Sequence, residues 1–318
     1  MTIRVRIATR GSALALYQAR QVAAALQAAG TQAGESVETV LCRIKTTGDM
    51  QRAEPLHVME AAGKGLFTRE IDRALCDGEA DVAVHSMKDL PAERPAETEL
   101  VAVLPRATPW DAIAFREPSW TVATLPRGAK VAVGSERRRL QLLRLRPDLA
   151  FQELRGNIPT RIKKLSAGAD AVVLAAAALE RLEINPVGLQ VFTREQMLPA
   201  VGQGIIAIEC RAGFEQRALV EAIRDPATWT VARAERAFLT AFGGGCHVPV
   251  GGLAWQANGQ GAPAELRMVA AHFSLTGGLN GTVEVDEVSG LGATGHAPEE
   301  LGRELAQRLK SLLAAAVR

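Results

Sequence analysis

The stretch Ala80–Pro91, ADVAVHSMKDLP, decides how the rest of the chain is interpreted. Its first half predicts a short buried strand, Asp81–His85, in which apolar side chains alternate. Pro91 fits neither a helix nor a continuing strand, so the polar residues between the predicted strand and Pro91 form a tight turn. In an open α/β sheet, ligands bind at this end of the strands. A turn that merely ends a strand is equally consistent with the spacing.

Asp89 is the candidate catalytic group of this turn. Because Lys88 is its neighbour, we expect the carboxylate to stay ionised at neutral pH. An ionised carboxylate at a strand end can stabilise a developing positive charge.

Composition indicates a globular protein of two or three domains. The chain has 318 residues, of which 47% are hydrophobic and 23% charged. The net charge of +2 argues against general nucleic-acid binding. Only 4% of the residues are aromatic, so base-stacking platforms are not expected.

Targeting and metal signals are weak throughout the chain. The first ten residues lack the apolar core of a signal peptide, and the longest apolar run, Ala171–Leu179, is too short to span a bilayer. The four cysteines are scattered, with no CxxC pair or His/Cys spacing typical of a metal site. We therefore expect a reduced, cytoplasmic protein without a membrane segment or a metal.

Strands and helices alternate in the first third of the chain. Predicted strands cover Ile3–Thr9, Glu38–Ile44 and Leu100–Leu104, and a helix capped by Ser12 closes at Gly30. This order favours a largely parallel sheet. The residues 51–65 predict a loop that delivers Lys64, and we expect its first part, 51–63, to act as a lid.

A second α/β series presents arginines. Strands are predicted at Lys130–Val133, Phe151–Leu154 and Asp170–Leu174, and the strand-to-helix turn after each of them is expected to present arginine. Arg137, Arg138 and Arg139 stand at a helix start, where they oppose the helix dipole unless an anion is bound. A solvated basic face is the alternative. The repetition predicts a cleft for several carboxylates or phosphates.

Two crossing segments, 105–109 and 198–204, indicate that the chain leaves its first domain and returns for the strand Ile205–Cys210. The tail from Val250 predicts a small α+β domain with about three strands and a helix from Pro298. Between the strand Ile205–Cys210 and this tail, Cys246 follows three glycines, in a loop that is expected to leave its thiol accessible.

Several common sites are not indicated. The sequence contains no GxGxxG, no GxxxxGK[ST] and no HExxH pattern, so nucleotide and zinc-protease chemistry are not favoured. Cys246 and His247 are adjacent and make a poor protease dyad. The residues alone define a hinged, anion-binding α/β protein with a candidate covalent attachment point.

Six motifs of the chain belong together: Ile7–Arg10, Gly63–Phe67, Val84–Asp89, Leu154–Asn157, Pro199–Gly204 and Gly244–Cys246. In these motifs the chain resembles the porphobilinogen deaminase (hydroxymethylbilane synthase) family. They are long and specific and run in order from residue 3 to about residue 255. The last 60 or so residues match only in expected architecture.

The resemblance implies a transferase of haem and porphyrin synthesis. It would join four porphobilinogen molecules head to tail into hydroxymethylbilane, with release of ammonia. A dipyrromethane cofactor, held by a thioether bond to Cys246, would prime the chain. The implied fold has two domains like periplasmic binding proteins, with mixed, mostly parallel sheets, and a small α+β C-terminal domain. We expect domain 1 at 1–104 with 205–224, domain 2 at 105–204 and domain 3 at 225–318, in a monomer.

The resemblance also assigns residues. Asp89 matches the catalytic carboxylate, which would deliver a proton to the departing amine and stabilise cationic pyrrole intermediates. The matching binders of cofactor and substrate carboxylates are Arg10, Ser12, Lys64, Ser86, Lys88, Ser135, Arg137, Arg138, Arg155, Arg161, Arg181 and Gln203. Guanidinium groups suit this task because each pyrrole carries two carboxylates.

Three positions depart from the family pattern. Glu60 stands where many members have a lysine, Val133 replaces a threonine, and Glu136 introduces an acid. One lysine contact and one hydroxyl contact are therefore in doubt.

Two other functions compete with the enzyme. A cytosolic anion-binding module would need neither Asp89 nor Cys246, so the glycine-flanked cysteine favours the enzyme. A regulatory effector-binding domain that acts on nucleic acid through a partner ranks last, because no helix-turn-helix or basic tail supports it.

Overall fold

The computed structural model describes residues 2–47, 68–243, 248–257, 265–274, 285–291 and 297–316, with the backbone alone for 285–291 and 316. The chain divides into two compact units. Unit 1 comprises Met1–Ala107 and Ile205–Thr230, and unit 2 comprises Thr108–Gly204 and Val231–Arg318. Among the described helices, none is long and apolar enough to cross a membrane.

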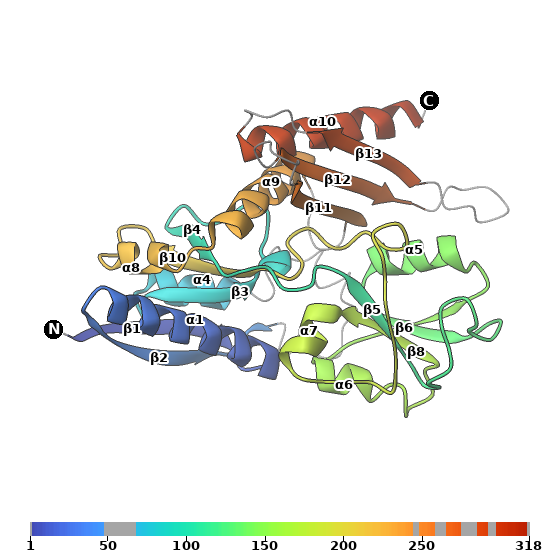
Figure 1. Cartoon of the computed structure of the whole chain (residues 1–318), viewed down its shortest axis with the longest axis horizontal. Coiled ribbons are helices and arrows are strands. Elements are labelled where there is room, and N and C mark those ends of the chain that lie inside the picture. Colours follow the sequence, from blue (N-terminus) through green and yellow to red (C-terminus); the bar gives the residue numbers. More distant parts are fainter. Residues whose placement is uncertain are drawn as a thin grey trace. The chain divides into compact units, whose positions relative to one another are not determined.

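Unit 1 is built on a five-stranded sheet in the order β2-β1-β3-β10-β4 (Figure 1). Strand β1 is parallel to β2 and β3, whereas β10 is antiparallel to β3 and β4. The elements are β1 (Thr2–Arg10), α1 (Ala13–Gln32), β2 (Ser36–Ile44), α4 (Arg69–Cys76), β3 (Val82–Ser86), the 3-10 turn η1 (Met87–Asp89), β4 (Thr98–Val103), β10 (Ile206–Arg211) and α8 (Arg217–Ala222).

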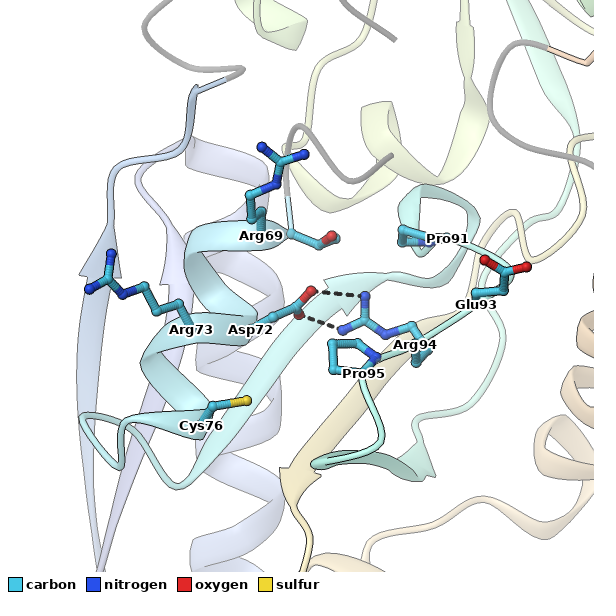
Figure 2. A pocket seen from close by; sticks show the side chains of 9 residues that line it. Arg69, Asp72, Arg73, Cys76, Pro91, Glu93, Arg94 and Pro95 are labelled. Atoms are coloured by element: carbon cyan, nitrogen blue, oxygen red, sulfur yellow. Dashed lines mark hydrogen bonds and ion pairs between the residues drawn. The ribbon is translucent and has the colours of Figure 1, made fainter. Parts of the chain in front are cut away.

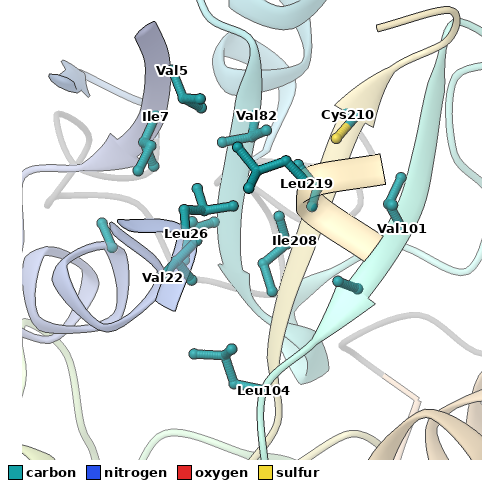
Figure 3. Close-up of a cluster of buried hydrophobic side chains, with 14 of the residues drawn as sticks. Val5, Ile7, Val22, Leu26, Val82, Val101, Leu104, Ile208, Cys210 and Leu219 are labelled. Atoms are coloured by element: carbon teal, nitrogen blue, oxygen red, sulfur yellow. The ribbon is translucent and has the colours of Figure 1, made fainter. Parts of the chain in front are cut away.

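The core of unit 1 lies between one face of this sheet and helices α1 and α8 (Figure 3). Alternate residues of β1, β3 and β10, such as Val82 and Val84 of β3, point into it. Ala83, between them, joins a smaller cluster on the other face with Ile71 and Leu75 of α4. The predicted strand is confirmed, and helices cover both of its faces.

Helix α1 forms where the sequence predicts it but ends two residues later. Ser12 is its N-cap, and its side chain accepts a hydrogen bond from the Ala15 amide at 3.2 Å. Gly30 does not end the helix. A Cβ there would lie 2.2 Å from Val37 Cγ2, so glycine is required because strand β2 passes close by.

Unit 2 contains a second five-stranded sheet, in the order β7-β6-β8-β5-β9. Strands β7, β6 and β8 are parallel, and β5 is antiparallel to β8 and β9. The elements are β5 (Asp111–Phe115), β6 (Lys130–Val133), α5 (Glu136–Leu145), β7 (Ala150–Glu153), α6 (Ile158–Ile162), β8 (Ala171–Ala175), α7 (Ala176–Arg181) and β9 (Gly188–Val191).

Strands β5 and β9 were not predicted. Both belong to the antiparallel part of the sheet, and β9 is a short edge strand whose large apolar side chains, Leu189 and Val191, are exposed. Strand β5 is fully buried, so polar and apolar residues do not alternate along it.

The remainder of unit 2 is a three-stranded antiparallel sheet with two helices. Its elements are α9 (Pro226–Phe242), in which the boundary between the units falls, β11 (Val250–Ala257), β12 (Glu265–Phe273), β13 (Val285–Leu291) and α10 (Pro298–Ala316). Helix α10 lies along β12 and β13 (Figure 1). The described fold therefore confirms the predicted class: α/β with two mixed sheets and a small α+β part.

Candidate functional site

Main-chain hydrogen bonds fix the polar turn that follows β3. Strand β3 ends at Ser86, and η1 carries Lys88 and Asp89. The Met87 amide donates to the Ile205 carbonyl at 3.0 Å, and the Leu90 amide closes the turn on Met87 at 3.1 Å. Met87 and Leu90 are buried, whereas Lys88 and Asp89 are only partly buried. The apolar residues thus fix the turn and leave the two charged groups at its outer side.

A glutamine that the sequence did not single out connects α1 to this turn. Gln18 is buried, and its Nε2 donates to Ser86 Oγ at 2.8 Å. Ser86 Oγ lies 3.3 Å from the amide oxygen of the same side chain. Gln18 could have been identified from the sequence, because it is a polar residue on the apolar face of α1, where a buried side chain needs a hydrogen-bond partner.

Arg10 and Ser12 lie at the neighbouring strand end. Arg10 is the last residue of β1, and β1 runs parallel to β3, so both strands direct their carboxyl ends to the same edge of the sheet. Ser12 follows as the cap of α1. The structure therefore brings the described unit 1 candidates, including Asp89, to one edge.

Arg137 and Arg138 pair with a carboxylate of the protein itself. Asp111, at the start of β5, is fully buried and accepts from Arg137 Nη1 at 2.8 Å. Its other oxygen accepts from Arg138 Nε at 2.9 Å and Nη2 at 2.6 Å. Burial alone would raise the pKa of Asp111, but the two guanidinium charges outweigh it and lower that pKa. Three arginines at a helix start therefore did not require an external anion.

The third of these arginines also has a local partner. Arg139 Nε donates to Glu136 Oε2 at 2.7 Å, one turn away on the exposed side of α5. Glu136, which departs from the family pattern, thus pairs with Arg139. Val133, the other described departure, is the last residue of β6 and is buried in the core of unit 2. Ser135 is the N-cap residue of α5, but its side chain makes no capping hydrogen bond.

The turns after β6 and β7 lie against each other. A Cβ on Gly134 would come within 2.6 Å of the Leu154 carbonyl oxygen and 3.8 Å of Arg161 Nη1. Arg161 Nε donates to the Gly156 carbonyl at 2.7 Å, and Arg155 donates to Glu153 through Nε and Nη2. These two arginines are partly buried, so the predicted basic turn exists and belongs to one rim of the sheet.

Gln203 lies in the crossing segment 198–204, which ends the first part of unit 2, and Arg181 contacts the same segment. Gln203 is fully buried, and its Nε2 donates to Asp111 Oδ1 at 3.0 Å and to the Pro109 carbonyl at 2.8 Å. Arg181 Nη2 donates to the Gly204 carbonyl at 2.7 Å. The sequence predicted that Arg181 lies in a strand-to-helix turn. This is wrong, because Arg181 is the last residue of α7.

Lys64, Glu60 and Cys246 lie outside the described residues, as does the expected lid at 51–63.

Four residues with buried polar contacts were not singled out from the sequence: Asp111, Gln18, Arg94 and Glu209. Glu209 and Asp111 could have been found as single acids next to or within apolar runs, because such a group needs a buried partner.

Comparisons with known proteins identify the family. The description "Porphobilinogen deaminase, dipyromethane cofactor binding domain" matches residues 5–218, and "Porphobilinogen deaminase, C-terminal domain" matches residues 229–311.

Curated relatives agree over nearly the whole length. Porphobilinogen deaminase of Rubrobacter xylanophilus is 45% identical over 311 residues, covering 97% of this chain and 94% of the relative. That of Sphingopyxis alaskensis is 44% identical, covering 92% of each, and the probable enzyme of Ignicoccus hospitalis is 37% identical, covering 98% and 96%.

Similar solved structures include the Bordetella pertussis BvgS periplasmic VFT2 domain, with 17% identity and a TM-score of 0.40 over 76% of this chain and 92% of that one. The putative periplasmic sulfonate-binding protein SsuA of Methylobacillus flagellatus shows 14% identity and a TM-score of 0.39, covering 75% and 69%.

The family descriptions and the relatives support one conclusion. The chain belongs to the porphobilinogen deaminase family, the transferases of tetrapyrrole synthesis that condense porphobilinogen into hydroxymethylbilane on a dipyrromethane cofactor.

Proposed function

We propose that Asp89 is the catalytic carboxylate of this porphobilinogen deaminase. The observation that carries the proposal is its position: Asp89 ends the 3-10 turn that directly follows β3, and buried neighbours on both sides fix the turn. A carboxylate held in this way can remain aimed at the reacting atoms without reorganising.

Asp89 has two tasks in this mechanism. It assists proton transfer to the departing amine of porphobilinogen, and its negative charge stabilises the positive charge that develops on the pyrrole. Lys88, next to it, binds a substrate carboxylate. Ser86, oriented by Gln18 through the hydrogen bond at 2.8 Å, supplies a hydroxyl at the same edge.

The described donor set fits a ligand with several carboxylates. Arg155 and Arg161 are partly buried at adjoining turns, and Arg10 and Lys88 are partly buried at the edge of the unit 1 sheet. Guanidinium forks match carboxylates in geometry and charge. Ser12, Lys64, Ser135, Arg181 and Gln203 complete the proposed binding set.

The cofactor is proposed to be attached at Cys246. Dipyrromethane, when bound, supplies the pyrrole end on which the chain is extended. Among the described cysteines, Cys210 is a poor alternative because burial raises its pKa to about 12.

Arg137 and Arg138 have a more specific role in this proposal. Each donates to Asp111, so each guanidinium is held in one orientation before any ligand arrives. Binding then needs little loss of side-chain freedom. We propose that these two arginines contact cofactor or substrate carboxylates through the donors that neither Asp111 nor the Leu198 and Val173 carbonyls use.

We also propose that the protein acts as a monomer in the cytoplasm. Cys42, Cys76 and Cys210 are unpaired thiols, as is typical of a reducing compartment. Equilibrium sedimentation that showed a stable dimer would contradict the first part of this proposal.

The variant Asp89→Asn tests the catalytic assignment. It retains the shape of the side chain and one acceptor oxygen but has no charge, and we expect turnover to fall by about a hundredfold or more. The matched control is Asp77→Asn, because Asp77 is a half-exposed acid that pairs with Arg73 at the end of α4. Near-normal turnover of Asp89→Asn would remove Asp89 from the mechanism.

Intact-mass measurement tests the attachment site. The denatured protein should carry extra mass that corresponds to a dipyrromethane, and a peptide map should place it on Cys246. The variant Cys246→Ser should lack this mass after incubation with porphobilinogen, whereas Cys76→Ser should retain it. A modified Cys246→Ser protein would contradict the assignment.

A further inference from the structure

A buried cluster of ionisable side chains flanks the turn that carries Asp89. Arg94 is at its centre, and Asp72 of α4, Glu209 of β10 and His85 of β3 surround it. These four side chains are at most 13% exposed. No task in the proposed reaction uses them.

Arg94 joins two carboxylates that come from different elements. Its Nη2 lies 2.5 Å from Asp72 Oδ1 and its Nη1 lies 3.2 Å from Asp72 Oδ2, as the dashed lines of Figure 2 show. Its Nε and Nη2 donate to the two oxygens of Glu209, at 2.8 and 2.6 Å. The guanidinium therefore ties the segment after Asp89 to both the helix and the sheet.

The electrostatics of the cluster favour this arrangement. Burial alone would raise the pKa of Glu209, but the neighbouring His85 and Arg94 outweigh it and hold that pKa at about 2. Burial raises the pKa of Asp72, and Arg94 only partly offsets this. Glu209 is therefore ionised at neutral pH and is the firmer anchor for Arg94.

The cluster is connected to both ends of the turn. His85 precedes Asp89 by four residues, and its Nε2 lies 3.2 Å from Glu209 Oε2. Arg94 follows Asp89 by five residues, and it lies beside Pro91 and Pro95 along a pocket of about 350 Å³ (Figure 2). One carboxylate, Glu209, thus contacts the chain before the turn and the chain after it.

We infer that Arg94, held by Glu209 and Asp72, is a positioning residue for Asp89, an inference that rests on the proposed catalytic role of Asp89. The two prolines stiffen the return segment, and Arg94 fixes its end, so the turn cannot tilt away from β3. Displacing a reacting group by about 1 Å can cost on the order of a hundredfold in rate.

A metal ion is a poor alternative occupant of this cluster. Asp72, His85 and Glu209 bring potential ligand atoms within 4.8 Å of one another, but the guanidinium of Arg94 bridges the two carboxylates. A divalent cation would have to displace Arg94 and repel its charge.

The variants Arg94→Met and Arg94→Lys test this inference. We expect Arg94→Met to lower kcat by about 10- to 100-fold, with KM for porphobilinogen and the cofactor mass unchanged. Lysine carries the charge but cannot bridge two carboxylates as a fork, so Arg94→Lys should have an intermediate kcat. The control Arg73→Met removes an exposed arginine from the same pocket wall and should leave kcat unchanged.

A double-mutant cycle separates positioning from general stability. If Arg94 acts through Asp89, adding Arg94→Met to Asp89→Asn should lower the residual turnover by less than twofold. An equal loss in both backgrounds, or a normal kcat in Arg94→Met, would overturn the inference. If Arg94→Met fails to fold, Arg94→Lys takes its place in the cycle. Near-normal turnover of Asp89→Asn alone would show that the proposed function has failed, and with it this inference.

Discussion

Asp111 and Arg138 form a buried ion pair in which Asp111 Oδ1 accepts two hydrogen bonds from one guanidinium, at 2.6 and 2.9 Å. The aspartate begins β5 and the arginine lies in the first turn of α5, 27 positions later. Arg137 binds the other oxygen, so two arginines that the family resemblance assigns to ligand carboxylates are first organised by a carboxylate of the protein.

Replacing Asp111 should therefore affect both stability and cofactor content. The variant Asp111→Asn leaves two buried guanidinium groups beside a neutral amide, at an expected cost of about 3–5 kcal/mol in the free energy of unfolding. Urea unfolding measures this cost, and intact mass measures the loss of cofactor. Glu136→Gln, on the exposed side of the same helix, serves as the control. Unchanged stability of Asp111→Asn would show that the pair contributes little.

Arg155 provides a test of the basic rim. Leucine cannot pair with a carboxylate, so Arg155→Leu should raise KM or reduce cofactor content by roughly 10- to 100-fold, which corresponds to the loss of one charged hydrogen-bonding contact. Steady-state kinetics and intact mass check this expectation. Arg127→Leu, at an exposed position before β6, should behave as the unmodified chain. Normal kinetics with full cofactor content in Arg155→Leu would remove it from the binding set.

Gly134 should not tolerate a side chain. A Cβ would lie 2.6 Å from the main-chain oxygen of Leu154, so the turn between β6 and α5 must shift in Gly134→Ala. We expect a loss of about 1–3 kcal/mol in the free energy of unfolding, measured by urea titration. Gly11→Ala is the control because nothing lies within 4 Å of its added Cβ. Equal stability of the two variants would contradict the close approach.

Acid should weaken unit 1 through Glu209. The folded-state pKa of about 2 lies below the ordinary 4.5, so the stabilising contribution is complete above about pH 4.5 and is lost as pH falls towards 2. Between pH 6 and pH 3 the loss should be on the order of 2 kcal/mol. Asp72, whose pKa is raised, acts in the opposite direction and reduces the net effect.

Urea unfolding at both pH values checks this expectation. The variant Glu209→Gln should be less stable at pH 6, and its stability should depend less on pH in this range. Glu99→Gln, which changes a partly exposed acid that pairs with Arg217, is the matched control. If Glu209→Gln lost as much stability on acidification as the unmodified chain, Glu209 would not be the group responsible.

The sequence alone determined the elements with a clear period and the turn that carries Asp89. Alternating apolar residues predicted β3, Ser12 marked the start of α1, and Pro91 ended the turn that carries Asp89. These features are local, because side-chain periodicity and proline geometry act within a few residues. The family motifs are local as well, and they placed Asp89 and Cys246 in their proposed roles.

Only the tertiary structure decided which charged groups pair. Arg138 and Asp111 are 27 positions apart, and Arg94 and Glu209 are 115 apart, on elements whose adjacency no pattern shows. Gly30 is a similar case, because the residue that leaves no room for a side chain there, Val37, lies in β2 beyond the end of the helix. The physical reason is that burial makes an unpaired charge costly, so a partner must exist, but chain topology alone determines which residue it is.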